Sequence, residues 1–287
     1  MHIVCCIKQV PDTAQVKIDP ETNTLIRSGV ESICNPYDLV AAEAAVQIAE
    51  KYGGRVTVIS MGPPQTESAL RDCLALGAEA AVLLSDRAFA GADTLATSYT
   101  LSRAISRIAA TEPVDLIICG KQAIDGDTAQ TGPGIATRLG YSQFTYVSEI
   151  IGVDQEKRTI RIRREVEGGS EIIEGRLPAL LTVELELTNP RYASLPVLVR
   201  ALRQDIKVWG ADDIGGSIEM MGLRGSPTLV NKIFAPPVRT GGLVFDITDN
   251  GEQAMEDFLN TLFQKEQKLL DDLLVTEKDS YAQEQPG

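Results

Sequence analysis

The sequence has almost no histidine and few aromatic residues. Its 287 residues include one His, at position 2, one Trp, and only 5% aromatic residues in total. A single His excludes a His-based metal site, a Ser-His-Asp triad and a Cys-His pair. The low aromatic content argues against a surface on which nucleic acid bases stack.

Basic residues are also in short supply. The chain has 27 Lys and Arg against 40 Asp and Glu, and its formal net charge is −13. Nucleic acids and anionic membranes select basic surfaces, so we expect neither as a partner. The acidity is uneven, because residues 251–287 contain nine Asp or Glu and three Lys. Such an acidic end favours solubility, with partner binding as the alternative.

Long apolar runs and cysteine pairs are missing as well. The apolar start of the chain, residues 1–7, is too short for a membrane span and lacks the basic flank of a signal peptide. The five Cys residues, at positions 5, 6, 34, 73 and 119, form no CxxC pair. Scattered thiols in apolar runs are typical of reduced, buried cysteines, so we expect a cytoplasmic protein.

The first half of the chain alternates predicted strands with predicted helices. We expect strands at residues 3–7, 55–60, 80–84 and 114–119, and helices at 39–51, 65–76, 94–110 and 130–139. This order predicts an α/β fold with a doubly wound, mainly parallel, Rossmann-like sheet that has helices on both faces.

The second half of the chain changes character. Four further strands, at residues 144–151, 159–166, 170–175 and 179–185, are expected to be antiparallel and to extend the sheet. Residues 1–188 would then form the nucleotide-binding α/β domain. Residues 189–250 are rich in Gly and Pro and predict an extended arm that lies on a partner. Residues 251–287 predict an amphipathic, acidic C-terminal helix and tail.

The loop after the fourth predicted strand carries the strongest functional signal. Residues 119–134 read CGKQAIDGDTAQTGPG and connect the strand to a helix. Ligands of open α/β sheets bind at the carboxyl ends of the strands, and N–H groups at a helix start suit a phosphate. The alternative is an ordinary turn in which Asp127 or Thr128 caps the helix.

The usual nucleotide fingerprints are absent. Neither GxxxxGK[ST] nor GxGxxG follows the first predicted strand, and the Ser-Gly-Gly-x-Asp loop of ATP-pyrophosphatases is missing too. The sequence therefore predicts a nucleotide holder without hydrolytic machinery. Asp125 and Asp127 as Mg²⁺ ligands are the less favoured interpretation, because no third ligand accompanies them.

Three segments resemble the beta subunit of electron-transfer flavoproteins. They are residues 120–132, Asn35-Pro36 with the helix that follows, and residues 189–196, which read NPRYASLP. The resemblance covers residues 1 to about 250 in order. It implies a heterodimer with an alpha subunit that carries FAD on a mobile domain.

The resemblance also implies which cofactors and partners are involved. Simple members of the family hold AMP in the beta subunit. Bifurcating members hold a second FAD, which accepts electrons from NADH. These electrons are divided between ferredoxin or flavodoxin and an acyl-CoA dehydrogenase or related flavoprotein. Residues 8–13, residues 89–98 and Gly126 resemble the anaerobic, bifurcating type, which favours FAD over AMP. An ATP-binding regulatory module is the alternative from a different class.

The resemblance assigns roles to individual positions. The backbone at Cys6 would meet the adenine, residues 35–38 would face the ribose, Met61 would fill a neighbouring strand end, and residues 123–131 would wrap the phosphate. No catalytic side chain and no metal ligand is expected. The expected cofactor-binding residues are Cys6, Lys8, Asn35, Asp38, Met61, Gly62, Asp93, Thr94, Thr97, Cys119, Gly120, Gln122, Ala123, Ile124, Asp125, Gly126, Asp127, Thr128, Ala129, Gln130 and Thr131.

Two further positions are implied to contact partners. Leu195 matches the tip of the loop that anchors the beta subunit on its dehydrogenase. Glu165 matches an acidic position near the moving flavin domain.

Overall fold

The computed structural model describes residues 1–12, 17–18, 25–26, 31–229, 243–248 and 250–265, without the side chains of residues 17–18 and 25–26. The chain forms two separate units, Met1–Ala235 and Pro236–Gly287. The candidate site lies in the first unit.

A nine-stranded sheet runs through the first unit. Its strands are β1 (His2–Ile7), β6 (Arg55–Met61), β7 (Ala80–Leu84), β8 (Leu116–Gly120), β9 (Ser142–Asp154), β10 (Thr159–Val166), β11 (Gly169–Arg176), β12 (Ala179–Val183) and β13 (Lys207–Trp209). Their spatial order is β11-β10-β9-β12-β8-β1-β6-β7-β13. In this spatial order, the seven strands β9-β12-β8-β1-β6-β7-β13 are all parallel to their neighbours. Strand β10 pairs antiparallel with β9 and with β11. Two small ribbons pair β2 (Gln9–Pro11) with β5 (Ser32–Cys34) and β3 (Lys17–Ile18) with β4 (Leu25–Ile26).

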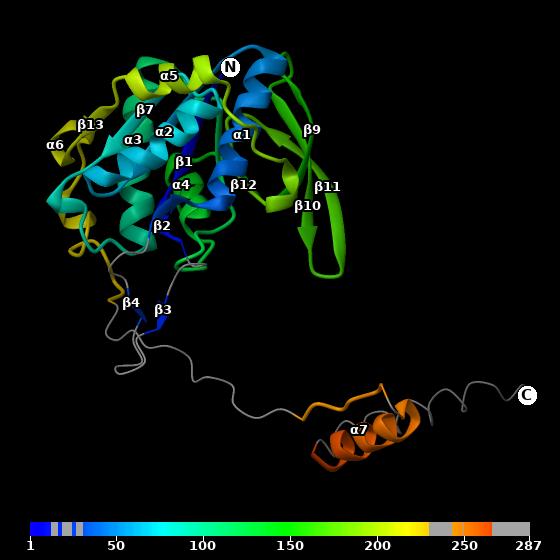
Figure 1. Cartoon of the computed structure of the whole chain (residues 1–287). Helices are drawn as coiled ribbons and strands as arrows, with labels where there is room; N and C mark the ends of the chain where they lie inside the picture. Colours follow the sequence, from blue (N-terminus) through cyan, green and yellow to red (C-terminus); the bar gives the residue numbers. More distant parts are fainter. Residues whose placement is uncertain (13–16, 19–24, 27–30, 230–242, 249, 266–287) are drawn as a thin grey trace, which may run out of the picture. The chain divides into compact units, whose positions relative to one another are not determined.

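Helices lie on both faces of the sheet (Figure 1). The helices of the first unit are α1 (Pro36–Tyr52), α2 (Glu67–Leu76), α3 (Thr94–Thr111), α4 (Thr131–Leu139), α5 (Leu195–Arg203) and α6 (Ala211–Ile214), with 3₁₀ turns η2 (Pro64–Thr66), η3 (Arg87–Phe89), η4 (Leu185–Leu187) and η5 (Ile218–Met220). α1 and α2 pack on one face, and α3 and α4 pack on the other. The predicted doubly wound α/β fold is therefore confirmed.

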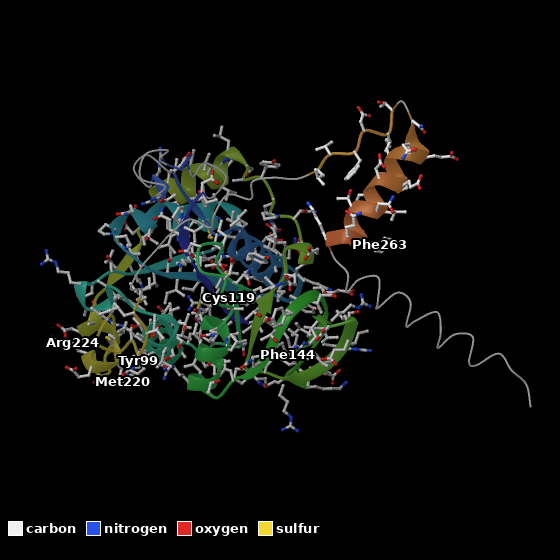
Figure 2. All side chains as sticks on the ribbon, turned by 90° about the horizontal axis from the view of Figure 1, so that it is seen from below. Tyr99, Cys119, Phe144, Met220, Arg224 and Phe263 are labelled. Atoms are coloured by element: carbon white, nitrogen blue, oxygen red, sulfur yellow. The ribbon has the colours of Figure 1, made fainter. Side chains whose placement is uncertain are left out.

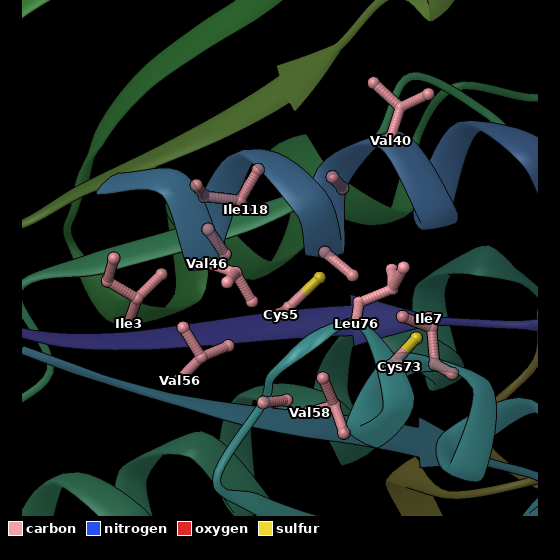
Figure 3. Close-up of a cluster of buried hydrophobic side chains, with 14 of the residues drawn as sticks. Ile3, Cys5, Ile7, Val40, Val46, Val56, Val58, Cys73, Leu76 and Ile118 are labelled. Atoms are coloured by element: carbon pink, nitrogen blue, oxygen red, sulfur yellow. The ribbon is translucent and has the colours of Figure 1, made fainter. Parts of the chain in front are cut away.

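Alternate residues of β1 supply the two halves of the core. Ile3, Cys5 and Ile7 point toward α1 and α2 and lie in one cluster with Val46 of α1 (Figure 3). The intervening residues of β1 pack against α3 and α4. This alternation follows from the two-residue period of a strand, and a strand covered on both faces is apolar throughout.

The expected direction of one strand is wrong. Residues 179–185 were expected to be antiparallel, but β12 is parallel to both β8 and β9. All five residues of β12 are buried, as is typical of a parallel strand with both faces covered. β12 therefore belongs to the parallel part of the sheet, and only β10 and β11 extend it in antiparallel fashion.

Part of the segment expected to be an extended arm is folded onto the sheet. β13 pairs with β7, and α5 lies beside α2. The Arg71 guanidinium of α2 donates to the carbonyl oxygens of Ala201, Leu202 and Gln204. Gly215 ends α6 with φ of 63°, and the segment turns there instead of extending.

The second unit contains α7 (Gly251–Lys265), which covers the first part of the predicted C-terminal helix. Its Phe258 ring contacts the Phe245 ring edge to face, with centroids 5.6 Å apart. Residues 266–287 of the predicted helix and tail lie outside the described residues.

The predicted buried thiols are confirmed. All five cysteines are free and buried, including Cys119, which Figure 2 labels. Over the residues that the structure describes, none of the helices has the length and apolar character that crossing a lipid bilayer requires.

Candidate functional site

A cavity opens where the chain order of the strands reverses. β1 lies between β6 and β8, so the connections that leave these strands diverge on either side of it. Such a switch point creates a crevice at the carboxyl ends of the strands. Here the crevice has a volume of about 1340 Å³ and is lined by the ends of β1, β6 and β8 and the starts of α3 and α4.

Most of the predicted cofactor-binding residues line this cavity. They are Cys6, Lys8, Asp38, Met61, Gly62, Asp93, Thr94, Thr97, Cys119, Gly120, Gln122, Ala123, Gly126, Asp127, Thr128, Ala129, Gln130 and Thr131. These residues come from four loops that are far apart in the sequence. The sheet brings them together because parallel strands end on the same edge.

Three predicted residues, Asn35, Ile124 and Asp125, do not line the cavity. Asn35 is fully buried, and its side chain donates to the carbonyl oxygen of Gln122 at 2.8 Å and accepts from the backbone N–H of Ile124 at 3.2 Å. Asn35 therefore positions the loop instead of facing the cavity. The Asp125 carboxylate pairs with Nζ of Lys8 at 2.7 Å.

The start of α4 has the features of an anion site. Ala129 has φ of 53°, and Gln130, the residue before the helix, is in the right-handed helical region. Successive residues of opposite hand turn their N–H groups to the same side and form a concave nest. No described side chain caps α4, so the N–H groups of Thr131 and Gly132 are available to a ligand at the cavity wall, while Pro133 has none.

Close packing holds this helix start against the sheet. A Cβ atom on Gly132 would lie 2.5 Å from Cγ2 of Thr182 and 2.9 Å from Sγ of Cys119. Such distances are far inside van der Waals contact. Only glycine at position 132 allows α4 to approach β8 and β12 this closely.

The start of α3 differs, because it is capped. Oδ1 of Asp93 accepts from the N–H groups of Leu95 at 2.9 Å and Ala96 at 3.0 Å. The Thr94 hydroxyl donates to Oε1 of Gln130 at 3.1 Å and thereby joins the two helix starts. Of these two helix starts, α4 is the one that offers free N–H groups to a phosphate.

A buried carboxyl group lies at the floor of the cavity. Asp38 accepts from the N–H of Lys8 at 2.8 Å and from the N–H of Gly120 at 2.9 Å. Burial raises the pKa of Asp38 to about 7, and these hydrogen bonds oppose the rise. A Cβ on Gly120 would lie 2.5 Å from Oδ1 of Asp38, so glycine is required there.

The thiols at the cavity are unreactive. Burial raises the pKa of both Cys6 and Cys119 well above the ordinary value. Both therefore remain protonated at neutral pH, and neither has the thiolate character of a nucleophile.

Some lining residues were missed by the sequence reasoning. Arg87 and Phe89 follow the third strand, and Lys121 lies inside the loop at residues 119–134, so all three positions had a signal in the sequence. Pro227 and Thr228 also line the cavity. They come from the segment expected to be an arm, and nothing in the local sequence indicated them.

The two predicted partner positions are both on the surface. Leu195 begins α5, and 73% of its surface is exposed. Glu165 is exposed on β10 and accepts from the Ser148 hydroxyl at 2.7 Å. The segment before Leu195 is fixed by Arg191, whose guanidinium pairs with buried Glu43 at 2.9 Å and with Glu50 at 2.7 Å.

Comparison with known proteins gives the family. The electron transfer flavoprotein domain matches residues 22–213. Electron transfer flavoprotein subunit beta of Clostridium acetobutylicum is 50% identical over 246 residues, which cover 86% of this chain and 92% of that protein. This chain belongs to the electron-transfer flavoprotein beta subunits.

Two other relatives agree with this assignment. Protein FixA of Azotobacter vinelandii is 55% identical over 242 residues, covering 84% of this chain and 86% of FixA. The caffeyl-CoA reductase-Etf complex subunit CarD of Acetobacterium woodii is 50% identical over 255 residues, covering 88% of this chain and 95% of CarD. The resemblance noted from the sequence is confirmed, and electron transfer by flavoproteins is the activity of the family.

Proposed function

We propose that this beta subunit binds FAD in the cavity and takes part in flavin-based electron bifurcation. It would act in a heterodimer with an electron-transfer flavoprotein alpha subunit that carries another FAD. NADH would be the electron donor. The acceptors would be ferredoxin or flavodoxin and an acyl-CoA dehydrogenase or related flavin dehydrogenase.

The free N–H groups at the start of α4 carry this proposal. These N–H groups suit a phosphate group, and the loop before them leaves room for a diphosphate. A Cβ on Gly126 would meet no atom within 4 Å, so the backbone there is open to a ligand. We propose that residues 123–131 hold the diphosphate of FAD, with the Thr94 and Thr97 hydroxyls beside it.

The size of the cavity favours FAD over AMP. Its volume of about 1340 Å³ is larger than the roughly 300–1000 Å³ that is usual for small-molecule sites. Beyond α4 the cavity extends to the loop that follows β7 and includes Arg87. Among the described residues, no carboxylate forms an ion pair with the Arg87 guanidinium. An AMP molecule would leave much of this space unfilled.

The chain supplies binding, orientation and exclusion of water. When bound, the flavin supplies the redox chemistry. Phe89, Leu101 and Ile135 give the cavity an apolar wall. Asp38 holds the loops that contain Lys8 and Gly120 at the cavity floor. No side chain of this subunit is needed as acid, base or nucleophile.

The partner assignments rest on the relatives and on one exposed surface. CarD is named as a subunit of a caffeyl-CoA reductase complex, which supports an enzyme of CoA thioesters as one partner. Leu195, Leu198 and Leu202 of α5 are 73%, 40% and 60% exposed, and we propose this face as the dehydrogenase contact. Reduced, buried thiols support a cytoplasmic location.

The test is to co-purify the chain with its alpha subunit and count the bound nucleotides. Mass spectrometry identifies each nucleotide, and absorbance follows flavin reduction after NADH is added. Two FAD per heterodimer and reduction by NADH support the proposal. One FAD and one AMP would instead make this chain part of a non-bifurcating carrier. Binding of ATP without any flavoprotein partner would make it a regulatory module.

A further inference from the structure

The rim of the cavity is held in place by a segment that comes from far along the chain. The loop after β7 lines the cavity, and residues 221–228 pack against this loop. The N–H of Leu223 donates to the carbonyl oxygen of Ala90 at 2.9 Å. Met221 is buried and packs in the same cluster as Phe89.

A close backbone contact fixes the start of this segment. Gly222 has φ of +53°, and a Cβ there would lie 2.1 Å from the carbonyl oxygen of Ala88. Nearby, the N–H of Ser217 donates to the Tyr99 hydroxyl of α3 at 2.9 Å. Figure 2 labels Tyr99 and Met220 in this region. The segment is therefore anchored before it reaches the cavity.

Asp93 makes the last contacts with the segment. Its N–H donates to the Ser226 hydroxyl at 2.8 Å. Its Oδ2 accepts from the Thr228 hydroxyl at 2.8 Å and from the Thr228 N–H at 3.2 Å. Because Oδ1 caps α3, both carboxylate oxygens are engaged by groups of the protein itself.

We propose that Ser226, Pro227 and Thr228 form a latch on the cavity rim, which Asp93 holds closed, and that opening of this latch limits nucleotide exchange. Asp93 is then a positioning residue that acts through Thr228. The inference rests on the proposed function, because it concerns an adenine nucleotide in this cavity.

The balance of contacts supports opening at this point. Pro227 and Thr228 line the cavity, and Thr228 is exposed on its other side. Polar contacts hold it, whereas Met221 is anchored in the core. Segments with few buried apolar contacts open at lower free energy than the core does. The latch therefore opens while residues before 222 stay in place.

Two substitutions weaken the latch without removing the helix cap. Thr228→Val replaces the hydroxyl by a methyl group of similar size. Asp93→Asn keeps an oxygen that caps α3, since Asn is a good capping residue. It replaces the charged Oδ2 by an amide group that cannot accept from the Thr228 N–H and can only donate to the Thr228 hydroxyl. Thr228→Ser keeps the hydroxyl and serves as the rescue variant. Thr248→Val, which removes a Thr-to-Asp246 hydrogen bond in the second unit, is the matched control.

The experiment measures nucleotide exchange in the full chain co-expressed with its alpha subunit. Isotopically labelled FAD, or in a second arm labelled AMP, is added in excess to the loaded protein, and mass spectrometry follows release of the bound molecule, which gives the dissociation rate. Adding the same nucleotide to protein depleted of it gives the association rate. Exchange of the FAD in the alpha subunit contributes the same background in all variants, because the substitutions are all in this chain. We expect both association and dissociation to accelerate about tenfold in Thr228→Val, which loses a charged hydrogen bond, and in Asp93→Asn, which loses the charge and the acceptor for the Thr228 N–H. The rates of Thr228→Ser and Thr248→Val should match the unsubstituted protein.

The outcomes separate the latch from the proposed function. A gate changes both rate constants and leaves the dissociation constant nearly unaltered, whereas a lost ligand contact accelerates dissociation alone. Unchanged rates in Thr228→Val, or faster dissociation alone, would overturn the latch while leaving nucleotide binding intact. Failure of the unsubstituted protein to take up either FAD or AMP would overturn the proposed function and the latch with it.

Discussion

The backbone N–H of Gly120, at the end of β8, donates to Oδ1 of Asp38 at 2.9 Å. The other carboxylate oxygen accepts from the N–H of Lys8, just after β1. One side chain at the start of α1 therefore ties together the two strand ends that border the switch point. The shape of the cavity floor depends on this carboxyl group.

Asp38→Asn is expected to change how stability depends on pH. The folded pKa of about 7 exceeds the ordinary 3.8, so the folded protein binds more protons than the unfolded chain between these values. The contribution of Asp38 is full below pH 3.8 and is lost as the pH rises to about 7. Asp38→Asn should abolish this loss. Urea unfolding at several pH values from 4.5 to 7.5 measures the unfolding free energy of both proteins. If its dependence on pH were the same in the variant, the raised pKa of Asp38 would be contradicted.

His2→Asn is the control of opposite sign. Burial lowers the pKa of His2 from 6.5, so its contribution is present at neutral pH and is lost as the pH falls below that value. Its Nε2 lies 3.0 Å from the Thr57 hydroxyl, remote from the cavity lining. The variant should remove some acid sensitivity and leave nucleotide affinity unchanged.

Gly132→Ala is expected to weaken both the fold and the site. The added methyl group would overlap Thr182 and Cys119, so α4 must move away from the sheet. We expect a loss of about 1–3 kcal/mol in unfolding free energy and weaker nucleotide binding. Gly169→Ala is the matched control, because a Cβ there meets no atom within 4 Å. Equal nucleotide affinities in the two variants would show that α4 does not bind the phosphate.

Arg191→Ala is expected to destabilise the first unit. Glu43 is 1% exposed, and without Arg191 its charge would be buried with the Gln47 amide as the one side-chain donor among the described residues. The expected loss is about 3–5 kcal/mol, measured by urea unfolding. Glu50→Gln breaks the exposed half of the same pair and should cost at most about 1 kcal/mol. Adding Glu43→Gln to Arg191→Ala should restore part of the loss, and no restoration would contradict this explanation.

Leu195→Glu is expected to impair partner contact but not folding. The side chain is 73% exposed, so unfolding free energy should change by no more than about 0.5 kcal/mol. If α5 contacts the dehydrogenase, the KM for that partner should rise while NADH reduction of the flavin is unaffected. Val208→Glu, at a 58% exposed position on the edge strand β13, is the matched control. Equal effects of the two variants on the KM would contradict the proposal that α5 contacts the dehydrogenase.

Much of the fold was predictable because local patterns carried it. Apolar runs such as residues 80–84 indicate buried strands, and Asp93 before an apolar repeat marks a helix start. The direction of β12 was not predictable. A short apolar run has the same appearance in either direction, and its neighbours alone decide how it pairs.

The sequence by itself determined the alternation of strands and helices, the loop at residues 120–131 and the family, because each depends on residues that are close together in the chain. The tertiary structure decided that Asn35 supports the loop, that Asp38 joins two strand ends, and that Thr228 reaches the rim beside Asp93. These contacts link residues separated by 82 positions in one case and 135 in another. Hydrogen bonds over such separations exist only once the sheet has brought the strand ends together.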